Sequence, residues 1–309
     1  MPKNQLIIAT RESPLALKQA HWVKMHLEAV HPDLKVKLLG MTTQADRMLT
    51  ISLSKVGGKG LFVKELEDAL LDTRADIAVH SVKDMPMELP VGLCMPIVCD
   101  REDPRDVFIS DQFTSLAQLP EGAAVGTSSL RRHCQLLAIR PGLTIIPLRG
   151  NVNTRLDRLD KGEFAALILA AAGLKRLGLQ NRFRSYLSIE QMLPAVGQGA
   201  LGIECRVNDK EVHELIAPLN HYTTQICVTA ERALCKRLGG GCQLPVGSYA
   251  EIVQDKVLLR GLVGSVDGQR LIYVQGTDVA QNAEKLGIKM AEELLQKGAG
   301  EILKNIIQT

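Results

Sequence analysis

The chain has 309 residues, of which 46% are hydrophobic and 23% are charged, values typical of a globular protein with two or three domains. No apolar run is long enough to span a membrane, and the N-terminus, with Arg11 and Glu12 close behind its first apolar stretch, does not resemble a signal peptide. A net charge of +3 and 3% aromatic residues argue against nucleic-acid binding. We therefore expect neither a membrane nor a nucleic-acid partner.

The cysteines indicate a reducing compartment. There are seven of them, an odd number, and their spacing shows neither a CxxC pair nor a Cys/His ligand set. Reduced thiols are typical of cytoplasmic proteins. We expect a cytoplasmic protein with no metal site.

The positive charge is concentrated in one stretch. Residues 126–184 contain nine arginines and two lysines against three acidic residues, an excess of eight positive charges, so the rest of the chain is acidic. With so few aromatic side chains, these arginines are better suited to small anions than to nucleic acid.

The first elements predict an α/β domain. Residues 5–9 form an apolar run typical of a buried strand, and Ser13 followed by Pro14 is typical of a helix start, with the helix reaching about Val30. Arg11 then lies where ligands bind in open α/β sheets, at the carboxyl end of a strand. A surface arginine in a loop is the alternative.

A second strand, residues 35–41, precedes a long polar segment, residues 42–60. Loops of this length are usually lids or binding loops, so Lys55 and Lys59 could close over an anion, although an ordinary solvated loop fits as well. Residues 61–71 have the period of an amphipathic helix.

Residues 75–80 are predicted to form a buried strand. Three polar residues, Ser81, Lys83 and Asp84, follow directly after it. Neighbouring residues of an extended chain point in opposite directions, so Lys83 and Asp84 can reach a ligand separately. The alternative is an aspartate that only forms a turn. After a strand at 93–99, the charged run 100–106 is interpreted as a crossing between domains.

The second domain repeats the strand-then-helix pattern. Thr127 and Ser129 precede a helix whose free N–H groups favour an anion. Arg131 and Arg132 differ by about 100° around that helix, so they could serve two carboxylates. Predicted strands at 144–148 and 164–169 bring further arginines to the same sheet edge: Arg149, Arg155 and Arg176.

A second crossing is predicted at the glycine-rich residues 194–204, and two crossings between two lobes make a hinge around a cleft. We expect a first lobe of residues 1–99 and 200–219, a second lobe of residues 100–199, and a C-terminal domain of residues 220–309. The elements expected after the second crossing are helices at 209–219, 223–238, 281–297 and 300–307 and antiparallel strands at 247–252, 256–264 and 270–276.

Residues 238–245 place Cys242 directly after three glycines and before Pro245. Glycine loses the most backbone freedom on ordering, so such a loop suits a thiol that carries a covalent group. A helix C-cap followed by an incidental surface cysteine is the alternative.

Taken together, these segments resemble the porphobilinogen deaminase family over essentially the whole chain. The segments that carry the resemblance, in order, are residues 10–13, 55–62, 80–84, 126–132, 149–155, 172–178, 194–204 and 238–247. The resemblance implies an α/β fold with two hinged periplasmic-binding-protein-like lobes around a cleft and a smaller α+β C-terminal domain with a three-stranded antiparallel sheet.

The resemblance also implies an activity. Such enzymes are transferases that join four porphobilinogen units head to tail with release of ammonia, in tetrapyrrole (heme) biosynthesis. The product is the linear tetrapyrrole hydroxymethylbilane, built on a dipyrromethane primer held covalently at Cys242. Each pyrrole carries an acetate and a propionate, which agrees with the local excess of arginine. A monomer is expected.

Residue roles follow from the same resemblance. Asp84 is expected to hydrogen-bond the pyrrole N–H groups and to offset the positive charge that forms as ammonia leaves. The residues expected to bind the dipyrromethane are Ser81, Lys83, Asp84, Thr127, Ser129, Arg131, Arg132 and Arg155. Those expected to bind the substrate are Arg11, Ser13, Arg149, Arg155, Arg176, Lys55, Lys59 and Phe62.

Two other functions remain open on the sequence alone. Two-lobed α/β proteins also bind anions without catalysis, although the extra domain with its thiol argues against a simple receptor. A thiol hydrolase or acyltransferase using Cys242 would need a base, and the only histidine near these motifs, His80, lies on a strand predicted to be buried.

Overall fold

The computed structural model describes residues 3–43, 63–241 and 243–307. The chain folds into two compact units. Unit 1 comprises Met1–Glu102 and Ala200–Gln225, and unit 2 comprises Asp103–Gly199 and Ile226–Thr309. The predicted division into three domains is not tested by this grouping and stays a prediction.

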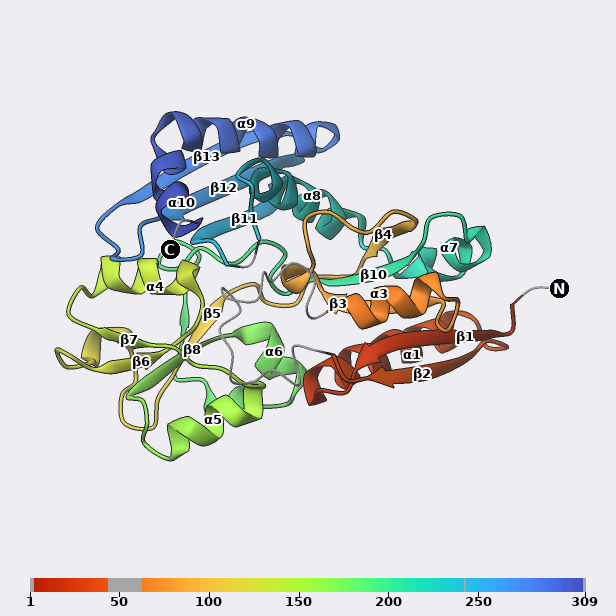
Figure 1. Ribbon diagram of the computed structural model, residues 1–309, viewed down its shortest axis with the longest axis horizontal. Coiled ribbons are helices and arrows are strands. Elements are labelled where there is room, and N and C mark those ends of the chain that lie inside the picture. Colours follow the sequence, from red (N-terminus) through yellow and green to blue (C-terminus); the bar gives the residue numbers. More distant parts are fainter. Residues whose placement is uncertain (1–2, 44–62, 242, 308–309) are drawn as a thin grey trace. The chain divides into compact units, whose positions relative to one another are not determined.

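Unit 1 is built on a five-stranded sheet with the order β2-β1-β3-β10-β4 (Figure 1). Strands β2 and β3 run parallel to β1, whereas β10 is antiparallel to both of its neighbours. The strands are β1 (Gln5–Arg11), β2 (Lys35–Met41), β3 (Ile77–Ser81), β4 (Leu93–Val98) and β10 (Leu201–Arg206). The predicted strands at 35–41 and 93–99 are confirmed, and β1 continues two residues beyond its prediction, so Arg11 is the last residue of the strand.

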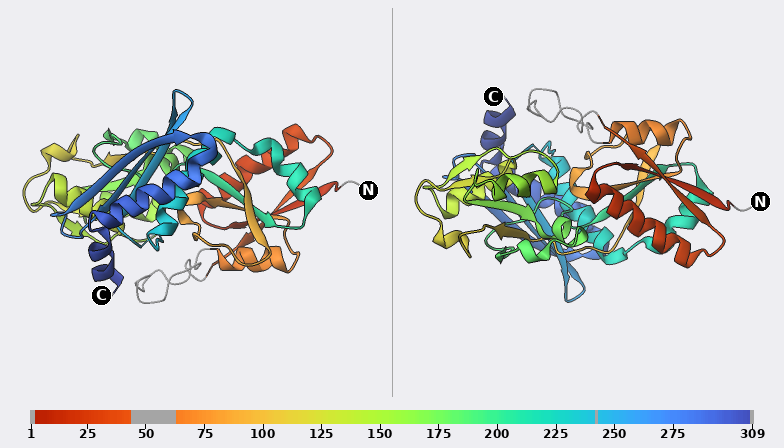
Figure 2. Two further views of the ribbon diagram at one scale, coloured as in Figure 1. Left: turned by 90° about the horizontal axis from the view of Figure 1, so that it is seen from above. Right: turned by 90° about the horizontal axis from the view of Figure 1, so that it is seen from below.

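Helices pack on both faces of this sheet. Helix α1 (Pro14–Val30) starts as predicted, with Ser13 as N-cap, and its apolar side packs on Leu6 and Ile8. Helix α3 (Lys64–Leu71) packs with Ala9 on the opposite face; Figure 2 shows the two helices on either side of the strands. Two helical segments follow β10, namely α7 (Lys210–Ile216) and the 3₁₀ turn η5 (Ala217–Leu219).

Unit 2 contains a second five-stranded sheet, and the order of its strands is β7-β6-β8-β5-β9. Its strands are β5 (Asp106–Ile109), β6 (Ala124–Gly126), β7 (Thr144–Ile146), β8 (Ala166–Ala170) and β9 (Ser185–Leu187). Because β6, β7 and β8 are parallel neighbours, their carboxyl ends share one edge, as predicted. The helices that follow them are α4 (Leu130–Ile139), α5 (Val152–Asp160) and α6 (Ala171–Arg176).

The rest of unit 2 is the predicted three-stranded antiparallel sheet with helices. Its elements are α8 (Tyr222–Arg237), which begins in unit 1, β11 (Val246–Val253), β12 (Lys256–Gly264), β13 (Leu271–Val279), α9 (Ala283–Gln296) and α10 (Ala299–Ile307). Gln254 and Asp255 both have positive φ, +49° and +62°, as a tight two-residue hairpin requires. The sheet packs on α4 through Cys134, Leu193 and Leu262, which explains why both parts belong to one unit.

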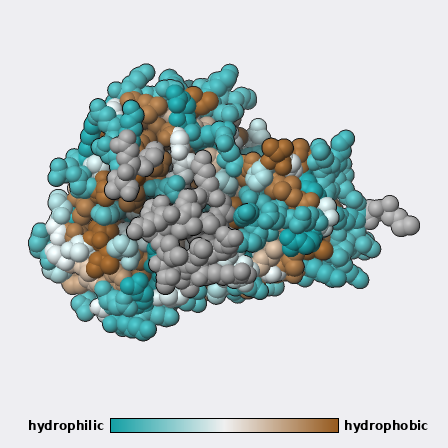
Figure 3. Space-filling view, viewed as in Figure 1, coloured by the Kyte–Doolittle hydropathy of each residue, from teal (hydrophilic) through white to brown (hydrophobic). Residues whose placement is uncertain are grey.

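No helix of the described residues is long and apolar enough to cross a membrane. On the face drawn in Figure 3, hydrophilic residues are interspersed with smaller groups of apolar residues. Scattered apolar side chains are normal on a protein surface and need no special explanation.

Candidate active site

Unit 1 contains a small polar hollow where β1, β3 and α1 meet. Its volume is about 60 Å³, room for a few water molecules at most. Arg11 at the end of β1 and Asp84 after β3 both line it. The other lining residues are Ser13, Leu15, Ala16, Gln19, Val63, Leu66, Val79, His80 and Ser81.

The polar groups of the hollow are held in place by the fold. Ser13 caps α1, where its Oγ accepts a hydrogen bond from the N–H of Ala16 at 3.4 Å. Gln19, buried on α1, donates through Nε2 to Ser81 Oγ at 2.9 Å. Asp84 ends a 3₁₀ turn, Val82–Asp84, and is exposed, so its carboxylate is accessible to a ligand.

One lining residue of the hollow, His80, is paired with a second buried residue, Glu204. His80 Nε2 is 2.9 Å from Glu204 Oε2, and both side chains are almost fully buried. Glu67 of α3 is buried close by, and burial, followed by the charges of Glu204 and Asp68, raises its pKa to about 7. His80 is therefore buried, as predicted from its strand.

Unit 2 places two guanidinium groups on a single buried carboxylate. Arg131 Nη2 donates to Asp106 Oδ2 at 2.9 Å, and Arg132 Nη2 donates to Asp106 Oδ1 at 2.8 Å. Although burial alone would raise the pKa of Asp106, the two arginines hold it well below its usual value. The two arginines thus share one internal carboxylate, a contact that their helical spacing did not predict.

The other predicted basic site residues of unit 2, Arg149, Arg155 and Arg176, lie after the parallel strands. Arg149 follows β7, and Arg155 lies on α5, where its Nε donates to the carbonyl of Gly150 at 2.8 Å. Arg176 ends α6 and donates to the carbonyl of Gly199 at 2.6 Å. The strands that precede these residues, β7 and β8, both run parallel to β6, whereas a shared anion site for the three arginines stays a prediction.

The two hydroxyl residues before α4 lie close together. Thr127 is buried, and its Oγ1 accepts a hydrogen bond from the N–H of Ser129 at 3.2 Å. Ser129 is the N-cap of α4, but its side chain makes no capping hydrogen bond. Its hydroxyl is therefore not used by the helix.

Four predicted site residues lie outside the described residues: Lys55, Lys59, Phe62 and Cys242. The glycines before Cys242 can be described. Gly239 has a φ of +73° and closes the end of α8, as the C-cap alternative predicted, and a Cβ on Gly240 would lie 2.6 Å from the Cys235 carbonyl. The backbone therefore favours glycine at position 239, where φ is positive, and at position 240, where a Cβ would clash with the Cys235 carbonyl.

Comparison with known proteins identifies the family. Residues 6–214 match the family described as "Porphobilinogen deaminase, dipyromethane cofactor binding domain". Residues 225–296 match "Porphobilinogen deaminase, C-terminal domain". The chain belongs to the porphobilinogen deaminase family.

Membership in the porphobilinogen deaminase family establishes the chemistry. The protein is a transferase, a hydroxymethylbilane synthase, that polymerises porphobilinogen to hydroxymethylbilane in tetrapyrrole synthesis and uses a dipyrromethane cofactor. This outcome favours the transferase over the anion receptor and the thiol hydrolase.

Three solved structures show distant similarity to this chain. The methionine-binding protein MetQ is 13% identical over 69% of this chain and 89% of its own, with a TM-score of 0.46. A periplasmic substrate-binding protein of an ABC transporter from Coxiella burnetii is 14% identical over 69% and 91%, also with a TM-score of 0.46. DctP7, an extracytoplasmic solute receptor from Bordetella pertussis that binds pyroglutamic acid, is 10% identical over 99% of both chains, with a TM-score of 0.44. These similarities are too low to transfer a ligand or an activity to this chain.

Three polar residues that hold predicted site residues in place, directly or through Asp106, were missed in the sequence. Gln19 reads as an ordinary polar residue of a helix, although its position facing the sheet could have indicated a buried amide. Asp106 belongs to a charged run interpreted as solvated surface, and Gln198, which donates to Asp106 Oδ1 at 2.9 Å, lies in a glycine-rich crossing.

Proposed function

We propose that Asp84 is the catalytic carboxylate of the porphobilinogen deaminase reaction. The observation that carries this assignment is the polar hollow of unit 1, where the exposed Asp84 shares the lining with Arg11 and Ser13. A carboxylate in this position can accept a pyrrole N–H hydrogen bond. An arginine and a hydroxyl group beside it can hold a substrate carboxylate.

The proposed reaction at Asp84 balances as follows. The bond between the aminomethyl carbon of porphobilinogen and its nitrogen breaks, and protonated nitrogen leaves as ammonia. A carbon–carbon bond to the growing chain forms, and the pyrrole carbon that is attacked loses its proton. Asp84 offsets the positive charge that develops on the substrate and moves these protons.

We further propose which residues hold the dipyrromethane. When bound through Cys242, this group would supply the terminal pyrrole to which the first substrate unit is added. The proposed binding residues are Ser81, Lys83, Asp84, Thr127, Ser129, Arg131, Arg132 and Arg155.

The cluster around Asp106 supports this proposal. Two guanidinium groups share one carboxylate, and the Nε atoms of Arg131 and Arg132 are buried without a hydrogen-bond partner among the described residues. Buried charge is costly unless it is paired, so one further anion would complete the cluster. The acetate and propionate groups of a dipyrromethane have the required charge.

The incoming porphobilinogen is proposed to bind Arg11, Ser13, Arg149, Arg155, Arg176, Lys55, Lys59 and Phe62. Arg149, Arg155 and Arg176 lie in segments that follow β7 and β8, the two strands parallel to β6, and each guanidinium group can form a two-bond contact with a carboxylate. We also propose that the lobes close on the substrate by a hinge and that the protein is a cytoplasmic monomer, as the resemblance and the odd number of cysteines suggest.

The intact mass of the purified, denatured protein tests the role of Cys242. We expect it to exceed the sequence mass by two deaminated pyrrole units, with the added mass on the peptide that contains Cys242. The Cys242→Ser variant should lack the addition, whereas Cys235→Ser, which alters a buried thiol of the preceding helix, should keep it. A fully active chain without the addition would contradict the assignment, and an acyl adduct would favour a thiol hydrolase.

A further inference from the structure

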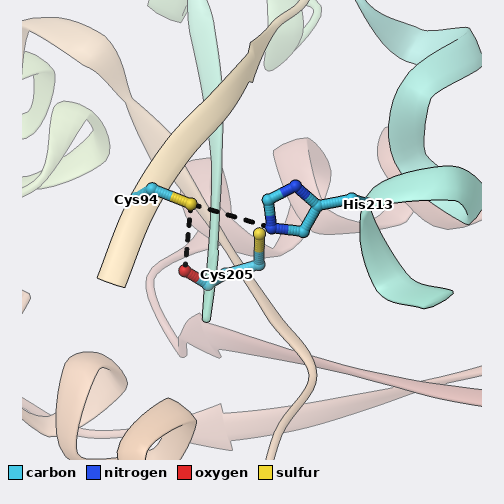
Figure 4. A group of neighbouring side chains, drawn as sticks. All are labelled: Cys94, Cys205 and His213. Atoms are coloured by element: carbon cyan, nitrogen blue, oxygen red, sulfur yellow. Dashed lines mark hydrogen bonds between the residues drawn. The ribbon is translucent and has the colours of Figure 1, made fainter. Parts of the chain in front are cut away.

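Three side chains with metal-binding atoms meet in unit 1, away from the residues assigned to catalysis. They are Cys94 of β4, Cys205 of β10 and His213 of α7, and their ligand atoms all lie within 4.8 Å of one another. Figure 4 shows the two sulfur atoms and the imidazole ring converging from three elements. Cys94 Sγ lies 3.8 Å from His213 Nε2.

The fold explains why the sequence hides this group. Cys94 and Cys205 are paired across β4 and β10, next to a register irregularity between Ile203 and Cys205. Asp209 then caps α7 directly after β10, and this tight connection brings His213 back over the strand. The earlier expectation of no metal site relied on sequence spacing, which cannot detect a cross-strand pair more than a hundred residues apart.

We propose that Cys94, Cys205 and His213 bind one Zn²⁺ ion, with water as the fourth ligand. A tetrahedral zinc site with usual bond lengths separates sulfur from nitrogen by about 3.6 Å and two sulfurs by about 3.8 Å. The observed sulfur–nitrogen distance of 3.8 Å is close to this value. Two thiolates and an imidazole favour zinc over Mg²⁺ or Ca²⁺, which take oxygen ligands.

Binding changes the protonation and hydrogen bonds of these three groups. Both thiols release their protons to solvent, and the imidazole must be neutral, with its proton on Nδ1. His213 Nε2 lies 2.9 Å from the carbonyl oxygen of Arg206, so the ion replaces this hydrogen bond. Cys94 is only partly buried, which gives the ion a route to the site.

The position of the site indicates a structural role. Cys205 is paired with Ile77 at the start of β3, whereas Ser81 in the polar hollow is paired with Leu201. Leu201 and Cys205 are four residues apart on β10, which corresponds to about 13 Å along the strand. The ion would therefore join the edge strand β4 to β10 and α7 without contacting the substrate.

The test uses the active protein with its cofactor attached, in which Cys242 is a thioether and does not compete for metal. After removal of metal by a chelator, Co²⁺ should bind with a thiolate-to-cobalt charge-transfer band, and Zn²⁺ should displace it at one equivalent per chain. Zn²⁺ should also raise the thermal unfolding midpoint and leave turnover unchanged. Cys94→Ser and His213→Gln should each weaken binding by more than about 100-fold, since losing even an outer-shell partner costs 10- to 100-fold.

The matched controls change the same residue types elsewhere: Cys235→Ser on α8 and His31→Gln at the end of α1. Both should bind Co²⁺ and Zn²⁺ as the unchanged protein does. Absence of the charge-transfer band, or binding that persists in either Cys94→Ser or His213→Gln, would overturn the proposal.

Discussion

Asp84 combines exposure with a fixed position. It follows a buried strand and ends a short turn whose Val82 is fully buried, so the backbone is anchored while the carboxylate faces the polar hollow. Arg11 and His80 line the same hollow. A substitution that keeps the size of Asp84 and removes its charge should therefore report on chemistry rather than on folding.

Asp84→Asn is expected to lower turnover by about 10²- to 10⁴-fold, the usual effect of losing a positioned acid or base. The expected reason is that an amide can neither offset a positive charge nor accept a proton. Turnover with porphobilinogen and the cofactor mass should be measured on the same preparation, with cofactor loading also attempted from a preformed linear tetrapyrrole. Asp72→Asn, an exposed change in the same unit, is the control. A cofactor-loaded Asp84→Asn protein within about threefold of the unchanged enzyme would exclude Asp84 from the mechanism.

Strand β5 is connected to neighbouring segments through one buried carboxylate, that of Asp106. Its first residue, Asp106, is fully buried and accepts hydrogen bonds from Arg131 and Arg132 of α4 and from Gln198. One carboxylate thus connects β5, the start of α4 and the segment that leads out of unit 2. These directional hydrogen bonds fix the positions of the three segments relative to one another more closely than hydrophobic packing alone would.

Asp106→Asn is expected to lower the free energy of unfolding by about 3–5 kcal/mol, because it leaves two buried guanidinium groups without their counterion. Asp160→Asn is the control, since its ion pair with Arg182 is partly exposed and such pairs contribute only about 0–1 kcal/mol. Urea unfolding of both variants measures the difference. Equal losses in the two variants would mean that Asp106 is not the electrostatic centre of the cluster.

The elements were more predictable than their contacts. Apolar runs and the Ser13-Pro14 start located β1, β2 and α1 closely, because these signals are local. Strand β5 was missed because it has only four residues and follows a charged run interpreted as surface. Predicted strand 144–148 is shorter in the structure, ending at Ile146, since Pro147 has no N–H to donate.

The position of a candidate residue was predictable where it ends or follows a strand, as with Arg11 and Asp84, which line one hollow; their chemical roles stay predictions. Contacts were not predictable where two side chains meet from distant segments. Asp106 and Arg131 are such a pair, and so are His80 and Glu204. Nothing in local periodicity records such contacts, because they depend on strand order.

The stability of the whole protein should depend on pH through Glu67. Burial and the nearby charges of Glu204 and Asp68 raise its pKa from 4.5 to about 7, and its Oε1 has no hydrogen-bond partner among the described residues. Between these two pKa values the folded protein keeps a proton that the unfolded chain has released. The contribution of Glu67 to the free energy of unfolding is therefore fully present below about pH 4.5, and it is lost as the pH rises to about 7.

Glu67→Gln should remove this pH dependence. Between pH 5 and pH 8 the unchanged protein is expected to lose about 1–3 kcal/mol of unfolding free energy through Glu67, and the variant should lose less by that amount. Glu214→Gln, the same change on an exposed side chain of unit 1, should keep the original pH dependence. Urea unfolding at both pH values compares the three proteins. If Glu67→Gln and the unchanged protein lose the same stability, Glu67 is ionised in the folded state at both pH values, and the raised pKa is wrong.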